Sequence, residues 1–207
     1  MNGIRKLVFI VAVLSASGIT VAATSGDPML YGFATRFGGR YDNVRMCVGS
    51  PAGAKGGPAG DVSVFVDVPA CRGASLHVDL PIMRPILFAF AFKMLQFEPS
   101  ASLRFIGKKT GGNGWVAGPA LGVSLNYGPD YRSENSGGGR TTSFFSLGPT
   151  IGGYAGLDFR RPGETFNFQL GISPYVTPLF GIDDPGNHKG VVVGCLVDGL
   201  FRFGNRE

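Results

Sequence analysis

Residues 141–181 contain two long runs in which apolar and polar side chains alternate, joined by the turn-forming residues 160–164. The apolar positions are Phe145, Leu147, Pro149, Ile151, Ala155, Leu157 and Phe159 in the first run, then Phe166, Phe168, Leu170, Ile172, Pro174, Val176, Pro178 and Phe180 in the second. The positions between them are mainly small or polar. Because successive side chains on a β-strand point to opposite faces, each run predicts a strand with one apolar and one polar face.

Aromatic residues stand at both ends of each run. Phe145 and Phe159 are 14 residues apart (159 minus 145), and so are Phe166 and Phe180 (180 minus 166). At a rise of about 3.3 Å per residue and a tilt of about 40°, this length spans roughly 35 Å, close to a bilayer with its interfaces. The small residues of the polar faces suit a narrow interior. The sequence therefore predicts an all-β fold, a closed antiparallel up-and-down transmembrane β-barrel with its apolar faces outward.

The N-terminus has the pattern of a secretory signal. Arg5 and Lys6 precede the apolar residues 7–21, and small residues lead up to Ala23. We therefore expect a cleaved signal peptide over 1–23 and a β-barrel domain over 24–207. Removal of Arg5 and Lys6 leaves 17 basic residues (19 minus 2) against 14 acidic ones, a net charge of +3. This charge is too small to indicate a nucleic-acid partner.

The same period of two predicts six further strands, at 29–37, 61–68, 75–82, 97–107, 115–127 and 189–203. Together with the two runs they make about eight strands, if residues 84–96 belong to the third strand or to its loop. Those residues are ambiguous. Phe88, Phe90 and Phe92 alternate with alanines, and we interpret the segment as a strand. Pro85 would also suit the start of a short helix over one mouth of the barrel.

The predicted connections sort into two groups. Longer segments fall at one end of the barrel, at 38–60, 128–140 and 182–188, and mostly shorter ones fall at the other, at 69–73, 108–114 and 160–164. Bacterial outer-membrane barrels have short periplasmic turns, longer outer loops and both termini on the periplasmic side. The loop pattern therefore agrees with that class of barrel.

These features resemble the small outer-membrane β-barrel proteins of Gram-negative bacteria, the class that includes the transmembrane domain of outer-membrane protein A. The resemblance is architectural and covers the mature chain through the closing Phe201-Arg202-Phe203. It implies outer-membrane localisation, outer-membrane lipid as surroundings and the barrel-assembly machinery as a partner. That machinery commonly reads an aromatic residue at the very end of the last strand, whereas here residues 204–207 follow Phe203. The resemblance carries over no catalytic residues.

Two sets of residues are candidates for a role in such a barrel. The aromatic girdle is expected at Trp115, Tyr127, Phe145, Phe159, Phe166, Phe180, Phe201 and Phe203. The charged side chains on predicted inward positions are Arg36, Asp67, His77, Asp79, Glu98, Arg104, Asp158, Arg160, Asp198 and Arg202. Because side chains fill the interior of an eight-stranded barrel, we expect these charges to form a buried ion-pair network. A path for protons or ions is the functional alternative.

The three cysteines do not all pair. A disulfide between Cys47 and Cys71 is chemically permitted in the periplasm, but the predicted topology puts the two residues near opposite mouths. The pairing therefore stays open. Cys195 is on a predicted outward position, where it acts as a small lipid-facing residue.

We expect a non-enzymatic role, structural, adhesive or narrow-channel, with no cofactor and no metal; the extracellular ligand is unknown. One alternative is a lipid-modifying barrel enzyme, for which only His77 and His188 are available as a histidine base. The other is a soluble lipocalin-like periplasmic barrel that binds a ligand between apolar faces turned inward.

Overall fold

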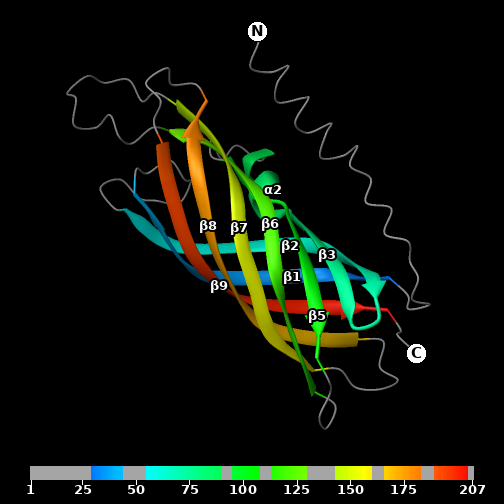
Figure 1. The fold of residues 1–207 in the computed structure, drawn as a ribbon. Coiled ribbons are helices and arrows are strands. Elements are labelled where there is room, and N and C mark those ends of the chain that lie inside the picture. The colour runs from blue at the N-terminus through cyan, green and yellow to red at the C-terminus, as the bar shows by residue number, and fades with distance from the viewer. Residues whose placement is uncertain are drawn as a thin grey trace, which may run out of the picture.

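The computed structural model describes residues 29–43, 55–89, 95–107, 113–129, 143–159, 166–182 and 189–204. Within these ranges the strands are β1 (Leu30–Asp42), β2 (Gly56–Cys71), β3 (Ala74–Pro81), β4 (Leu95–Phe97), β5 (Ser100–Ile106), β6 (Asn113–Pro129), β7 (Ser143–Phe159), β8 (Phe166–Gly181) and β9 (Lys189–Phe203). A short helix, α2 (Met83–Ala89), lies between β3 and β4 and sits near the upper end of the strands in Figure 1.

In the described part of the chain, eight strands form a closed ring in the order β1-β2-β3-β5-β6-β7-β8-β9. All neighbours in the ring are antiparallel, and β9 returns to pair with β1. This last pairing runs from Tyr31 opposite Phe203 to Asp42 opposite Val192. Closure gives each long strand two neighbours, which removes the exposed edges of an open sheet. The predicted closed antiparallel barrel is confirmed.

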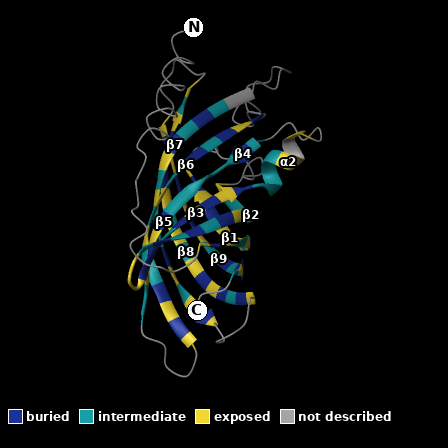
Figure 2. Ribbon diagram, turned by 90° about the vertical axis from the view of Figure 1, so that its right-hand side faces the viewer, coloured by how far each residue is buried: buried dark blue, intermediate teal, exposed yellow. Residues whose placement is uncertain are grey.

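Apolar side chains line the outside of the ring, and polar side chains line the inside. Exposed large apolar residues include Phe33, Leu121, Ile151, Ile172 and Val197. The fully buried residues are largely polar and include Ser63, Asp79, Asn126, Gln169 and Asp198. Figure 2 shows this alternation as bands of exposed and buried residues along the strands. The orientation is the predicted one and is opposite to that of a lipocalin-like barrel with an apolar interior.

The first hairpin is longer than the sequence predicted. Residues 38–60 were expected to form a loop, but β1 continues to Asp42 and β2 already begins at Gly56. Gly39 pairs with Pro58, and Tyr41 pairs with Gly56. Backbone groups make these ladder contacts, so a segment with few side chains to pack can still form a strand. Pro58 is tolerated because β3 reaches along β2 only as far as Ser63, which leaves Pro58 with one neighbouring strand.

The interpretation of residues 84–96 as a strand is wrong for residues 84–89, which belong to the helix α2, whereas Leu95 and Gln96 belong to the short strand β4. Residues 90–94 lie outside the described residues. The ring leaves no place for an additional long strand there, since β5 already pairs with β3 on one side and β6 on the other. Pro85 stands in the first turn of α2, where a backbone N–H has no helical partner to lose. Over the described ranges, the chain has no helix long and apolar enough to cross a membrane.

The predicted strand 97–107 is divided into two strands along the same neighbour. Phe97 of β4 pairs with Leu125, and Ser100 of β5 pairs with Gly122. Pro99, between them, has no N–H to donate, although its carbonyl accepts a hydrogen bond from the Val123 backbone N–H at 3.1 Å. β4 and β5 together therefore occupy one position in the ring.

Candidate functional site

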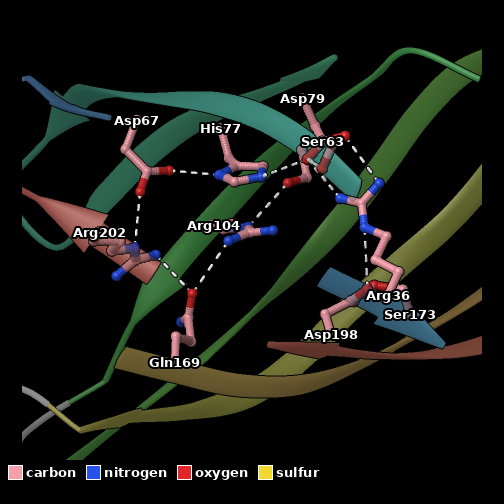
Figure 3. Close-up of polar contacts among 11 residues, drawn as sticks. Arg36, Ser63, Asp67, His77, Asp79, Arg104, Gln169, Ser173, Asp198 and Arg202 are labelled. Carbon is pink, nitrogen blue, oxygen red and sulfur yellow. Dashed lines mark hydrogen bonds and ion pairs between the residues drawn. The ribbon is translucent and has the colours of Figure 1, made fainter. Parts of the chain in front are cut away.

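The candidate site is a cluster of polar side chains in the barrel interior, most of which are labelled in Figure 3. We call it the interior network and define it by its members, which are Arg36, Ser63, Asp67, His77, Asp79, Arg104, Asp158, Gln169, Ser173, Asp198 and Arg202. They come from β1, β2, β3, β5, β7, β8 and β9. Each occupies a position of the inward-facing parity, so strand alternation brings them into one space.

Arg36 holds two aspartates at the centre of the interior network. Its Nη1 and Nη2 donate to the two carboxylate oxygens of Asp79 at 2.9 and 2.6 Å. Its Nε lies 3.1 Å from Oδ1 of Asp198. The hydroxyl of Ser63 donates to Asp79 at 2.9 Å, and that of Ser173 donates to Asp198. The planar guanidinium matches a carboxylate at two points, so this one side chain links β1, β3 and β9.

His77 connects the Arg36 group to a second group of charges. Its Nδ1 lies 2.7 Å from Oδ1 of Asp67, and its Nε2 lies 3.7 Å from Oδ2 of Asp79. The Phe65 ring packs beside the imidazole, with 4.7 Å between ring centroids. Among the described residues, no hydroxyl or thiol hydrogen-bonds to this histidine. Its geometry is therefore that of a link between two carboxylates and includes no nucleophile.

Arg202 and Arg104 meet at the side chain of Gln169. Arg202 donates to Oε1 of Gln169 at 2.6 Å, and Arg104 donates to the same oxygen at 3.2 Å. Arg202 also lies 3.0 Å from Asp67 and 3.7 Å from Asp158. The guanidinium of Arg104 lies 4.1 Å above the centre of the Tyr154 ring. The polar contacts therefore run without a break from Asp158 to Ser173.

Apolar side chains share the interior with these charges. Ala34, Phe65, Val116, Tyr154 and Leu200 form a buried cluster on inward positions of β1, β2, β6, β7 and β9. Charges buried in such surroundings are costly unless they are paired and hydrogen-bonded. At this level the polar network and the apolar cluster therefore occupy most of the interior.

A separate polar group lies near α2. The carboxylate of Glu98 accepts hydrogen bonds from Gln96 at 2.6 Å and from Ser124 at 2.7 Å. Arg84 of α2 donates to Gln96 at 2.5 Å and to the backbone carbonyl of Gly60 at 3.3 and 3.4 Å. These bonds attach α2 to β2 and β4 at the mouth of the barrel.

The structure brings together most of the charged residues that the sequence placed inside. Glu98 lies in the separate group near α2, and Arg160 lies outside the described residues. The sequence reasoning did not single out Ser63, Gln169, Ser173 or Tyr154, although all four stand at positions of inward-facing parity. That parity was the available signal. Only charged residues were predicted as members of the network, so these four were left out.

The predicted girdle residues lie toward the ends of the strands. Exposed members are Trp115, Tyr127, Phe159, Phe166, Phe180 and Phe203, whereas Phe145 and Phe201 are half-buried. Several aromatic rings pack together near the start of β1 and the end of β9. The rings of Phe33 and Phe201, for example, stack with 4.7 Å between centroids. These contacts join neighbouring strands across the closure of the ring.

The remaining candidates are the cysteines, His188 and the expected signal peptide. Cys71 is an exposed free thiol at the end of β2, and Cys195 is an exposed free thiol on the outward face of β9. Cys47, His188 and the expected signal peptide over 1–23 lie outside the described residues. Within the described ranges, no group of three or more histidine, cysteine, aspartate or glutamate side chains is arranged to hold a metal ion.

Gly171 of β8 provides space for the Tyr154 ring, so Gly171→Ala should destabilise the barrel by about 1–3 kcal/mol. A Cβ atom added at Gly171 would overlap the Cζ and Oη atoms of Tyr154. The matched control is Gly39→Ala, because a Cβ atom there meets nothing within 4 Å. Urea unfolding of the refolded protein measures both changes. The double variant Tyr154→Ala with Gly171→Ala should lose less than the sum of the single losses. Equal effects of the two glycine variants would contradict the packing.

A closed ring of eight antiparallel strands, apolar outside and charged inside, is the fold of the small outer-membrane β-barrels. A solved structure with this fold is the crystal structure of Neisserial surface protein A (NspA). The two structures align with a TM-score of 0.51, covering 84% of this chain and 98% of that chain at 10% sequence identity. This similarity is one of fold alone. Neither a protein-family model nor a curated protein matches the sequence.

Proposed function

We propose that this chain is an outer-membrane β-barrel protein with a structural or adhesive, non-enzymatic role. The observation that carries the proposal is the reversed distribution of side chains. Exposed apolar residues cover the outside of the ring, while aspartates and arginines are buried inside it. Exposure of these apolar side chains to water is unfavourable, whereas contact with the acyl chains of lipid is not. Ring closure pairs the backbone groups of each strand with two neighbours, as a hydrocarbon environment requires.

The positions of the aromatic residues support two membrane interfaces. Toward one end of the ring, Tyr127 is opposite Phe145 in the β6–β7 register. At the other end, Phe166 of β8 is opposite Phe203 of β9. Outer-membrane barrels have girdles of aromatic side chains at both membrane interfaces. Two such levels would hold the barrel at a fixed depth.

The side chains that occupy the interior support a role as a membrane anchor over a role as a channel for ions. The interior network and the apolar cluster occupy the interior at the level of Arg36 and Phe65. A barrel of this size is closed by its own side chains. Its activity would then reside in the segments that it displays at its mouths, with outer-membrane lipid and the barrel-assembly machinery as its partners.

Membrane fractionation, with heated and unheated samples compared by gel electrophoresis in detergent, tests the proposal. We expect recovery in the outer-membrane fraction and a change of mobility on heating, because a closed barrel resists unfolding in detergent until it is heated. A soluble periplasmic protein from the same cells serves as the control. Recovery in the soluble fraction without a mobility change would rule out the proposed location. Steady single-channel conductance in a planar bilayer would instead support the narrow-channel role.

A further inference from the structure

The interior contains a cavity of about 90 Å³ beside the interior network. Arg104 and Tyr154 line it, together with the hydroxyl-bearing residues Ser100, Ser102, Thr150 and Ser173. Guanidinium groups and hydroxyl groups donate hydrogen bonds. The hydroxyl of Ser173 already donates to Asp198, so Arg104, Ser100 and Ser102 remain as donors toward an acceptor in the cavity.

Arg104 differs from the other arginines of the interior network. Arg36 and Arg202 each lie within ion-pair distance of two aspartates. Arg104 is only 3% exposed, yet among the described residues its hydrogen bonds go to neutral acceptors alone. Its Nε donates to the Ser102 hydroxyl at 3.1 Å, and its Nη1 donates to Gln169 at 3.2 Å. Its Nη2 makes no hydrogen bond to a described residue, and Figure 3 shows it without a dashed line.

The acidic side chains nearby are already engaged with other groups. Asp67 contacts His77 and Arg202 through its two oxygens. Glu98 also lines the cavity, but it makes no hydrogen bond and no ion pair with Arg104 in the described part of the chain. Both of its oxygens accept hydrogen bonds, from Gln96 and Ser124. The guanidinium of Arg104 therefore has unused hydrogen-bonding capacity toward the cavity, and a buried cation favours a counter-charge.

We propose that the cavity binds a small monovalent anion of halide size, held by Arg104 with the hydroxyl groups around it. The volume accommodates one such ion with several water molecules, since about 10–15 Å³ of space for its centre is enough to hold one water. The Tyr154 ring covers one face of the guanidinium, so the ion would approach its edge, where the N–H groups point. This site does not depend on the location of the barrel, so it goes beyond the proposed function.

Bromide is the probe for the first test, which uses the full protein folded in detergent. Sodium bromide replaces sodium gluconate at constant ionic strength, and the midpoint of thermal unfolding is measured. We expect the midpoint to rise with bromide concentration in the wild type, because a ligand that binds only the folded state stabilises it. The rise should be absent in Arg104→Gln. It should persist in Lys189→Gln, which removes an exposed cation at the start of β9.

A second measurement needs no variant and remains informative if Arg104→Gln does not fold. Wild-type crystals grown in bromide should show an anomalous scattering peak beside the guanidinium of Arg104. Such a peak, or a bromide-dependent rise that Arg104→Gln removes, supports the site. Crystals without a peak at Arg104 would overturn it. An equal rise in the wild type and in Arg104→Gln would overturn it as well.

Discussion

Replacement of Arg36 by methionine should lower the free energy of unfolding by about 3–5 kcal/mol. The change removes the two-point contact with Asp79 and the contact with Asp198. Both aspartates are buried and lose their cation, which is the costly outcome of breaking a buried pair. Urea unfolding in lipid vesicles measures the loss. The fluorescence of Trp115 reports the transition, since this residue is the only tryptophan of the chain and lies on the outward face.

Two further variants test the physical reason for that loss. Arg72→Met removes an exposed arginine from the turn between β2 and β3, and it should change the stability by about 0.5 kcal/mol or less. Combining Arg36→Met with Asp79→Asn and Asp198→Asn should recover part of the loss, because neutral amides leave no unpaired buried charge. If Arg36→Met alone lowered the free energy of unfolding by less than about 1 kcal/mol, the ion pairs of Arg36 would not be important for the stability of the barrel.

The orientation of the strands could be predicted from the sequence because it depends on a local period. A period of two places every second side chain on the same face, whichever strands become neighbours. Ile151 and Leu170 were placed outside and Asp158 and Asp198 inside by this rule, and the structure agrees. The same rule predicts the first and last residues of each strand only approximately. Backbone pairing can extend a strand into a glycine-rich segment such as 56–60, where no apolar alternation marks it.

The partners within the interior network could not be predicted in this way. In the strand register, Arg36 is opposite Asp61 on β2 and opposite Asp198 on β9. Its two-point partner is nevertheless Asp79 of β3, one strand beyond its immediate neighbour. A long side chain inside a narrow barrel reaches past the adjacent strand, so its partner depends on the stagger of the ring. That stagger depends on the pairing of all strands together.

The helix α2 and the residue Tyr154 show two other limits. Residues 84–96 satisfy the period of two, but a long strand also needs a free neighbouring edge. β5 already occupies the position between β3 and β6, and only the short strand β4 pairs with β6 beyond it. Tyr154 follows Gly152-Gly153 at an inward position where a large ring would not be expected in a narrow barrel. It fits because Gly156 and Gly171 leave space beside it on β7 and β8. This complementarity is a property of the three-dimensional neighbours and is not visible in either strand alone.

Ile151→Arg should cost about 2–4 kcal/mol if the barrel spans a bilayer. Ile151 is the middle residue of β7, is 52% exposed on the outward face and is opposite Leu121 and Val176 in the register. A charged side chain at the centre of the hydrocarbon layer loses its hydration, which is unfavourable in free energy. The same change at an exposed position in water is usually worth no more than about 0.5 kcal/mol.

Depth within the strand provides the matched control for this change. Val191 also faces outward but lies at the beginning of β9, so Val191→Arg should cost only about 0–1 kcal/mol in the same vesicles. Urea unfolding followed by Trp115 fluorescence compares the two variants under identical conditions. A larger loss for Ile151→Arg means that the middle of the outer surface contacts hydrocarbon, since the two positions differ chiefly in their distance from the barrel mouth. Equal, small losses would mean that this surface faces water or another protein, and the proposed membrane location would then be abandoned.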